Sequence, residues 1–456
     1  MKNMKINFNI GINSTTDMTL KVKLFIEDIP AMEVLHLFRS KSKVLDIQSK
    51  VEYKEDKDFI HFKINGAKSF ELEYAVQVGF LAKHGAYGLV TKDMVAFAGE
   101  QALLLPFETL NLASNKNKLG FDLKISYDFD TYENAIVPYK NGTESSLFAS
   151  IWGNMFEVMK SSYVFTKVDT HNINNNFKLH TNFKVDDVTK NNLNKIYAYY
   201  ADLFKTEIEL NLTSLQTEFA QKLFAGSSKS NICATFDFTN KRDYQLISHR
   251  MFHAFMDTRL NHSVFHMPPN LWVTEGLASL YEHKALEVLD TDFKNAYDIS
   301  FDEELKKLYR TYLYSISKNE KLYSFPPLLE GNLQSNALIE YLHYTKSPLL
   351  IKFFEDASLL DGENQFINYL LSLETLENFS QPDMFKNILT ENLNDITIKY
   401  IFGAEKLHLD IDPTGDVEKI REELTEFERV MSTWFELDKV KNDSSVTDED
   451  LKLFSN

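Results

Sequence analysis

Short runs that alternate apolar and polar residues dominate the chain up to about residue 140. They are rich in β-branched and aromatic side chains, and examples are KINFNIGI, TLKVKLFI, FIHFKI, SFELEYAVQV and FDLKISYDF. A period of two residues is typical of strands that bury one face and expose the other. Polar breaks such as NSTTD and KEDKD separate the runs. The pattern predicts an N-terminal antiparallel β-sandwich over residues 1–140.

The period lengthens after the turn-rich segment PYKNGTESS. Helical spacing in DVTKNNLNKIYAYYADLFKT is followed by the strand-like runs EIELNLTSL and NICATFDF and by two apolar helices, SHRMFHAF and LWVTEGLASLYEH. We therefore expect residues 141–300 to form a mixed α/β domain and residues 301–456 a helical C-terminal domain. The chain is predicted to be an α+β multidomain protein whose last residues, NDSSVTDEDLKLFSN, are solvated.

Composition narrows the class of protein. A net charge of −17 without a local cluster of Lys and Arg disfavours binding to nucleic acid. No apolar run approaches the roughly 18 residues that a membrane span needs, and the N-terminus lacks the apolar segment of a signal peptide. The single cysteine, Cys233, suits a reducing compartment and is expected to be a small buried hydrophobe. We expect a cytoplasmic protein with no nucleic-acid partner and no membrane span.

Two histidines four positions apart, His249 and His253, lie in the predicted helix SHRMFHAF. Side chains at this spacing lie on one helix face, so both imidazoles can reach a single metal ion about 2.0–2.1 Å from each ring nitrogen. Two core histidines would show the same spacing, and a third ligand is needed to separate the two interpretations. Glu275, in the first turn of the next predicted helix, is the candidate.

The two segments together resemble those of the gluzincin metallopeptidases, in particular the aminopeptidase N-like and glycyl aminopeptidase-like branches. The resemblance is carried by an H-x-x-x-H helix followed by W-x-x-E-G-x-A-S-x-Y, which is matched at Trp272, Glu275, Gly276, Ala278, Ser279 and Tyr281. It implies that His249, His253 and Glu275 bind zinc, with water as the fourth ligand. It also implies a thermolysin-like fold for residues 141–300.

A further match is the run from Tyr344 to Leu350, YTKSPLL, which resembles a Y-x-K-G-x-x-L segment of these families. The resemblance gives the Tyr344 hydroxyl the role of stabilising the oxyanion that develops in peptide hydrolysis. A phenol donor near a metal ion can do this, because it stabilises charge that forms only in the transition state.

The sequence departs from the family at Arg250, which stands where the family has the glutamate that acts as general base. An arginine stays protonated and cannot accept a proton, and general-base catalysis contributes roughly 10²–10⁴-fold to the rate. A guanidinium buried in this apolar helix needs a carboxylate partner. Glu282, on the helix of Glu275, and Asp237, on the preceding strand, are the candidates.

The glutamate of a G-x-M-E-N-like strand, which holds the substrate amine in aminopeptidases of this kind, has no counterpart in NICATFDF. Phe236 and Asp237 at the end of this run, together with Glu282, are the candidate substrate-binding residues. We expect this strand to lie at the edge of a sheet, where its unpaired backbone groups bind an extended peptide.

Three functions remain open. The first is a degenerate gluzincin with a peptide-binding cleft and a zinc site, inactive or very weak as a peptidase. The second is an active zinc-dependent aminopeptidase-like enzyme whose site is rebuilt, with Glu282, Asp237 or the substrate as base. The third is a scaffold without metal, in which His249 and His253 are core residues. His262 and His266 are either auxiliary ligands or solvated loop histidines.

Overall fold

The structure is a computed structural model. It describes residues 3–40, 42–82, 85–109, 121–129, 134–138, 140–141, 144–149, 158–218, 222–228, 231–260, 271–318, 336–356, 366–372, 406–434 and 445–455. The chain forms two compact units, of which the first comprises Met1–Asp243 and Ala254–Asn261 and the second Tyr244–His253 and His262–Asn456. The predicted division into three domains, 1–140, 141–300 and 301–456, stays a prediction.

The first unit begins with the β-sandwich that the sequence predicts. One sheet has the order β15 (Lys140–Asn141), β16 (Glu144–Ala149), β13 (Phe121–Asp128), β1 (Met4–Ser14), β2 (Thr19–Glu27), β7 (Ser69–Gln77) and β4 (Lys43–Gln48). The other has the order β12 (Leu105–Pro106), β3 (Val34–Phe38), β6 (Phe59–Lys63) and β5 (Tyr53–Glu55). All their pairings are antiparallel except that of β1 with β13.

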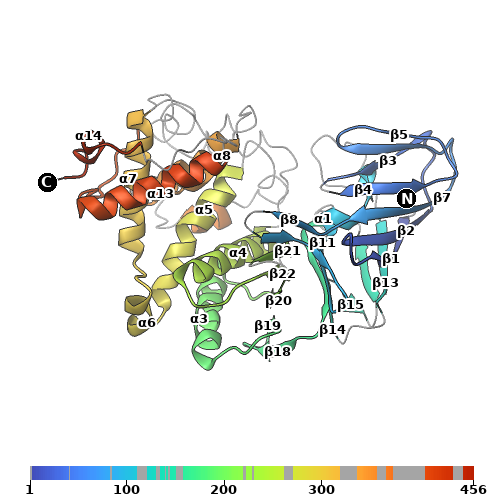
Figure 1. The fold of residues 1–456 in the computed structure, drawn as a ribbon, viewed down its shortest axis with the longest axis horizontal. Coiled ribbons are helices and arrows are strands. Elements are labelled where there is room, and N and C mark those ends of the chain that lie inside the picture. The colour runs from blue at the N-terminus through green and yellow to red at the C-terminus, as the bar shows by residue number, and fades with distance from the viewer. Residues whose placement is uncertain are drawn as a thin grey trace. The chain divides into compact units, whose positions relative to one another are not determined.

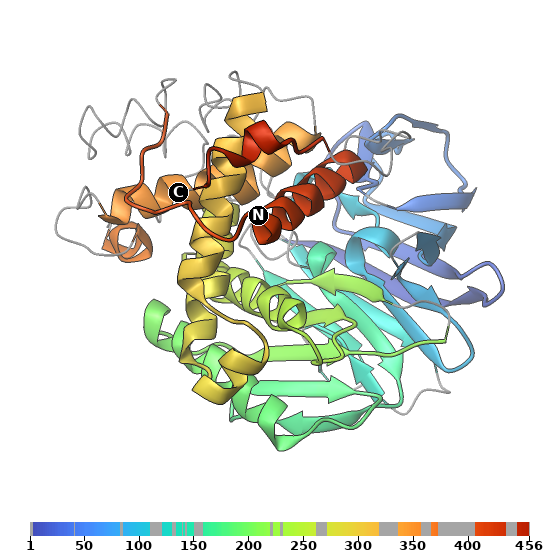
Figure 2. The same ribbon diagram turned by 60° about the vertical axis from the view of Figure 1, so that its left-hand side comes forward.

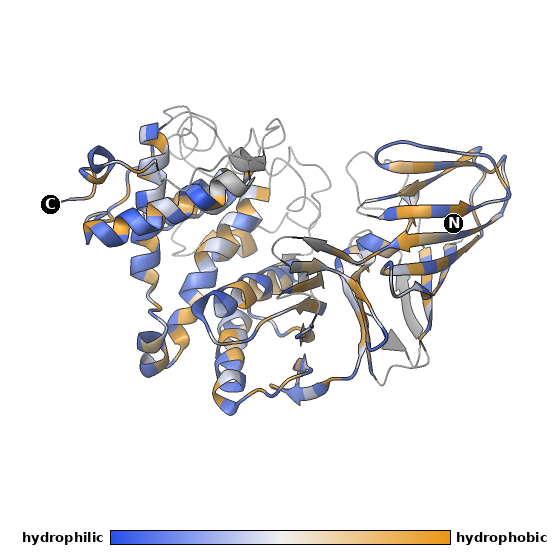
Figure 3. Cartoon of the chain, viewed as in Figure 1, coloured by the Kyte–Doolittle hydropathy of each residue, from blue (hydrophilic) through white to orange (hydrophobic). Residues whose placement is uncertain are grey.

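Alternation of side chains explains the packing of this sandwich. Along β1, Ile6, Phe8 and Ile10 are buried, and they share a hydrophobic core with Leu35 of β3 and Phe62 of β6. Figure 3 shows the resulting alternation of hydrophobic and hydrophilic residues along these strands. Burial of one face of each sheet therefore accounts for the period of two in the sequence.

Two further sheets follow in the same unit. A four-stranded sheet has the order β10 (Leu89–Val90), β11 (Met94–Ala98), β17 (Ser162–Thr166) and β14 (Asn134–Ile136), and two short helical segments, α1 (Gly99–Ala102) and η1 (Phe107–Thr109), follow β11 along the chain. A mixed sheet has the order β18 (Asp169–Asn172), β19 (Phe177–Thr181), β20 (Leu210–Ser214), β22 (Asn231–Ala234), β21 (Leu223–Ser227), β9 (Gly85–Tyr87) and β8 (Phe80–Ala82).

Helix α3 (Asp187–Phe204) connects the parallel strands β19 and β20 of the mixed sheet (Figure 1). The Asp186 carboxylate caps the helix by accepting a hydrogen bond from the backbone N–H of Thr189. The apolar stripe of the helix is buried, and the Tyr197 ring stacks on Phe177 of β19 at 5.6 Å between centroids. The helix and the strands thus form the mixed α/β arrangement that the change of period predicts.

The strand in NICATFDF does not lie at a sheet edge, and the sequence-based expectation is wrong on this point. Strand β22 pairs in parallel with β20 on one side and antiparallel with β21 on the other. The neighbour β21 is the run LFAGS, which the sequence analysis does not identify as a strand. Because β22 has a neighbour on each side, its backbone does not offer a peptide the open edge that the expectation required.

The second unit is helical, as predicted for the C-terminal part. Its elements are α5 (Leu271–Lys284), η3 (Ala285–Val288), α6 (Thr291–Ala296), α7 (Phe301–Lys318), α8 (Asn336–Tyr341), the π-helix η6 (Leu342–Lys346), α9 (Ser347–Asp356), α10 (Phe366–Ser372), α13 (Val417–Trp434) and α14 (Asp448–Leu451). Helix α13 crosses α7 in Figure 1, and Figure 2 shows the two helices side by side. None of the helices among the described residues combines the length and apolar character of a membrane span.

A small core holds the C-terminal segment in place. Val446, Leu451 and Phe454 are buried with Ile420 and Leu424 of α13. The prediction that this segment is solvated is therefore wrong. Its three buried apolar side chains are interspersed with charged and exposed residues, which hide the pattern in the sequence.

Candidate metal centre

Helix α4 (Lys241–Leu260) carries His249 and His253, and both fall in the part of α4 that belongs to the second unit. The side-chain oxygen of Asn240 accepts a hydrogen bond from the backbone N–H of Asp243 in the first turn, as an N-cap does. Buried Ile247, Met251 and Phe252 anchor the helix through other faces. The two imidazoles lie one turn apart on the same face of the helix, with 3.0 Å between their Nε2 atoms.

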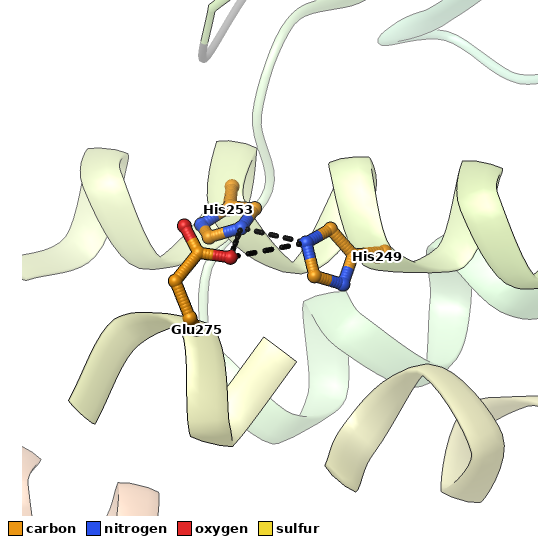
Figure 4. A group of neighbouring side chains, drawn as sticks. All are labelled: His249, His253 and Glu275. Carbon is orange, nitrogen blue, oxygen red and sulfur yellow. Dashed lines mark hydrogen bonds and ion pairs between the residues drawn. The ribbon is translucent and has the colours of Figure 1, made fainter. Parts of the chain in front are cut away.

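The carboxylate of Glu275 on α5 completes a three-ligand cluster with these histidines (Figure 4). Glu275 Oε2 lies 3.5 Å from His249 Nε2 and 3.6 Å from His253 Nε2. Ligands about 2.0–2.1 Å from zinc at a tetrahedral angle are separated by about 3.3 Å. The separations of 3.0, 3.5 and 3.6 Å are close to this value. The cluster therefore has the donor types and the spacing of a zinc site.

Charge and burial are coupled in the cluster. Burial alone favours a neutral Glu275 carboxyl, but the charges and hydrogen bonds of His253 and His249 hold its pKa well below the usual value. Burial likewise disfavours a charged His249, yet the carboxylates of Glu275 and Glu282 outweigh it and raise the His249 pKa. A half-buried carboxylate that is held ionised is a group that a metal cation can neutralise.

Glu282 lies behind His249, two turns after Glu275 on α5. His249 Nδ1 donates to Glu282 Oε2 at 2.7 Å, which leaves Nε2 to face the cluster. The Ser248 hydroxyl donates to the Glu282 carbonyl, which ties α4 to α5 at the same level. A carboxylate on the far nitrogen of a ligating histidine fixes its ring and its tautomer. The geometry thus gives Glu282 a positioning role that the sequence analysis did not assign.

Tyr344 reaches the cluster from the π-helix η6. Its hydroxyl donates to Glu275 Oε2 at 3.0 Å, and its ring lies 6.2 Å from that of His249 between centroids. Although the Tyr344 residue is 40% exposed, desolvation of its hydroxyl and the charge of Glu275 raise the pKa of the phenol, so it keeps its proton. The structure therefore brings together the four residues that the sequence places in one site, and it keeps the phenol in the form that can donate.

A close helix contact explains the glycine of the motif. A Cβ atom at Gly276 would lie 2.7 Å from the Ser347 Cβ and 3.1 Å from the Ser347 backbone carbon. Only glycine allows α5 to approach the start of α9 so closely. Because Ser347 follows η6 directly, this contact also sets the distance between Glu275 and Tyr344.

Arg250 is only partly buried, which corrects the expectation of a guanidinium enclosed in an apolar helix. Its charge acts on Tyr344 and favours the ionised phenol, although burial and the charge of Glu275 outweigh it. The positive charge at position 250 is therefore close enough to act on the cluster. Arg250 itself cannot take the role of the missing glutamate, because a guanidinium has no atom that accepts a proton.

The remaining candidates lie elsewhere. Phe236 is 3% exposed, whereas Asp237 is exposed and accepts hydrogen bonds from the backbone and hydroxyl of Thr239. Both belong to the first unit, and their role in substrate binding stays a prediction. Cys233 is fully buried, as expected for a small hydrophobe. His262 and His266 lie outside the described residues.

Sequence analysis missed one acidic residue, Glu340 on α8. Its Oε2 atom is buried and has no hydrogen-bond partner among the described residues. Burial and the charge of Glu275 raise the Glu340 pKa to about 7, and the charge of His343 only partly offsets them. In the sequence, only its position one helical turn before Tyr344 points to Glu340, and that spacing alone does not show where the carboxyl lies.

Comparison with known proteins identifies the fold. No family model and no curated protein sequence matches the chain. An aminopeptidase N family protein from Idiomarina loihiensis is similar with a TM-score of 0.62 and 12% identity, over 89% of this chain and 77% of that one. Native yeast LTA4 hydrolase gives a TM-score of 0.52 and 12% identity, over 89% and 68% of the two chains.

Aminopeptidase A of Legionella pneumophila, in complex with aspartic acid, gives a TM-score of 0.51 and 13% identity, over 88% of this chain and 49% of that one. The chain thus spans about half of the Legionella protein. Identities this low establish the fold alone. The predicted α+β multidomain architecture is confirmed, and the chain has the fold of the aminopeptidase N family proteins.

Proposed function

We propose that this protein binds zinc and peptides in a gluzincin-type site and hydrolyses peptides very weakly or not at all. One observation carries the proposal: the ligand atoms of His249, His253 and Glu275 all lie within 4.8 Å of one another. Two imidazoles and a carboxylate from two helices are the donor set of catalytic zinc sites, which keep a fourth position open. Zinc bound there would polarise a water molecule or a peptide carbonyl.

The positions of Glu282 and Tyr344 support a metal site over a scaffold with two core histidines. A scaffold has no need for a carboxylate that orients His249 through Nδ1, nor for a phenol that points at Glu275. Both contacts have a clear use beside a metal ion, because one orients a ligand and the other can donate to developing negative charge. We therefore favour the metal site over the scaffold.

Arg250 supports the weak hydrolysis in this proposal. Without a carboxylate at position 250, the site lacks the general base of the gluzincins, a type of group that contributes roughly 10²–10⁴-fold to the rate. A cation near the cluster also repels a metal ion, so we expect weaker zinc binding than an acidic residue there would give. Peptide binding requires neither a general base nor a negative charge at position 250. It is therefore the activity that we expect to remain.

Titration with zinc tests this proposal. Protein purified without chelator and without a histidine tag should bind one zinc ion per chain, and His253→Ala should lower the affinity at least 100-fold. His408→Ala is the matched control, because His408 is exposed and lies outside the cluster. Calorimetry with unblocked peptides should show binding to the zinc-loaded protein. Equal zinc affinity of the His253 variant and the native protein would favour the scaffold.

A further inference from the structure

The carboxylate of Glu340 has a buried oxygen to which no described residue donates a hydrogen bond. Glu340 lies one turn before Tyr344, on the segment that leads from α8 into the π-helix. Glu340 Oε2 is the one carboxylate oxygen in the described part of the chain that is buried without a hydrogen-bond partner. Among the described residues nothing donates to this oxygen, so it keeps a lone pair that can accept a proton.

Helical spacing places Glu340 near the cluster, because it lies one turn before Tyr344, whose hydroxyl donates to Glu275. The negative charge of Glu275, from α5, acts on Glu340, and Glu340 in turn acts on Tyr344. The charge of His343 on η6 lowers the Glu340 pKa, and the charge of Arg250 on α4 lowers the Tyr344 pKa. Glu340 does not belong to the group of three whose ligand atoms lie within 4.8 Å of one another. It is therefore a neighbour of the ligands and not one of them.

Other carboxylates of the site are already engaged. Glu275 contacts both histidines and accepts from Tyr344, and Glu282 accepts from His249 Nδ1. A proton acceptor must have a lone pair that is not occupied by a donor. Among the described carboxylates near the cluster, Glu340 Oε2 meets this condition. Its pKa of about 7 also lies where a group can both take up and release a proton at neutral pH.

We propose that Glu340 is the proton acceptor of this site and supplies part of the general-base catalysis that the chain lacks without a glutamate at position 250. This inference rests on the proposed zinc and peptide site. A water O–H bond breaks, and its proton moves to Glu340 Oε2. The water oxygen forms a bond to the peptide carbonyl carbon, and Tyr344 donates to the carbonyl oxygen as it becomes negative. The C–N bond then breaks, and the proton passes from Glu340 to the leaving nitrogen.

Glu340→Gln tests the inference, because it keeps the shape of the side chain and removes the proton acceptor. The residual peptide hydrolysis of the zinc-loaded protein should fall at least about tenfold, but by less than the full general-base factor of roughly 10²–10⁴. Zinc affinity should change less than tenfold, since Glu340 is not a ligand. Glu340→Asp retains a carboxylate and should keep part of the activity. Glu303→Gln, an exposed change on α7, is the control and should leave hydrolysis unchanged.

A second readout does not depend on activity. Zinc entering the cluster should ionise Glu340, so native protein at pH 6.5 should release up to about one more proton per zinc than Glu340→Gln. Calorimetric titration with zinc in two buffers of different ionisation enthalpy measures this difference. Equal proton release would overturn the inference.

The two proposals fail in different ways. If native protein binds no zinc, both are wrong. If it binds zinc and peptide but hydrolyses no peptide between pH 5 and 9, or if Glu340→Gln hydrolyses as fast as native protein, only the role of Glu340 is overturned. In an Arg250→Glu background, the restored glutamate takes the proton, and Glu340→Gln should cost less than tenfold. A loss of tenfold or more in that background would also overturn the inference.

Discussion

Two histidine pairs in the described part of the chain differ in the groups that surround them. In the β-sandwich, His36 and His61 face each other across β3 and β6 with 2.6 Å between their Nδ1 atoms. His61 Nε2 contacts the exposed Asp56 at 2.9 Å on the other side of the ring. In the second unit, His249 and His253 instead direct their Nε2 atoms, 3.0 Å apart, at the carboxylate of Glu275.

The difference lies in where the acid is placed. At His36 and His61 the two Nδ1 atoms are hydrogen-bonded to each other, and their separation of 2.6 Å is well below the roughly 3.3 Å of two zinc ligands. Asp56 lies behind one ring. At His249 and His253 the acid comes from a separate helix and faces both nitrogens. Proximity of two histidines is therefore insufficient for a metal site, and a third group must converge on the same point.

The largest effect expected is that of Arg250→Glu. The substitution restores a carboxylate beside the cluster and removes a positive charge, so zinc affinity should rise. Peptide hydrolysis should also increase, by the part of the roughly 10²–10⁴-fold general-base factor that Glu340 does not supply. Zinc titration and a peptidase assay measure the two changes. An unchanged metal content together with a lower melting temperature would mean that the helical pair resembles the sandwich pair after all.

Removing the acid behind each pair sharpens the contrast. Glu282→Gln weakens the hold on the His249 ring and should lower zinc affinity about 10–100-fold. Asp56→Asn, the corresponding change in the sandwich, should leave zinc affinity unchanged. Both variants can be titrated with zinc under identical conditions. Equal effects of the two substitutions would remove the distinction between the pairs.

Gly276→Ala tests whether the position of the second helix matters. The added Cβ would meet Ser347 Cβ at 2.7 Å, so α5 and α9 must move apart at a cost of about 1–3 kcal/mol in the free energy of unfolding. The same movement should separate Glu275 from Tyr344. Gly415→Ala is the control, because the nearest atom there is 3.6 Å away and the expected change is within about 0.5 kcal/mol. Chemical denaturation measures both.

The smallest effect concerns pH, and its sign should be opposite for the two pairs in metal-free protein. Burial and the charge of His61 lower the His36 pKa, so this group contributes stability above pH 6.5 that is lost as the pH falls below it. The His249 pKa is raised, so its contribution is present below pH 6.5 and is lost as the pH rises through the folded value.

Denaturation curves between pH 5 and 8 resolve the two contributions when the variants are compared. His36→Gln should flatten the acid side of the stability profile, and His249→Gln the neutral side. A steeper loss of stability at acid pH in His36→Gln would contradict the assignment.

The cluster could be predicted from the sequence because its signals are local. His249 and His253 share a helix turn, and Glu275 follows in a motif whose glycine has a packing reason. Strand β21 was missed because Gly226 adopts a φ of +113° and the pairing with β22 is irregular there, which breaks the period of two. Glu340 was missed because its significance depends on burial and on the charge of Glu275, which lies far away in the sequence.

Strands β8 and β9 have a consequence for how the protein is synthesised. Residues 80–87 leave the ribosome long before residues 223–227, yet β9 pairs in parallel with β21, and Ala86 and Leu223 share one core. This pairing cannot form during translation until the later strand has emerged, and contacts so distant in sequence fold slowly. Until then the early segment carries an unpaired strand edge, the type of surface on which nascent chains aggregate and chaperones act.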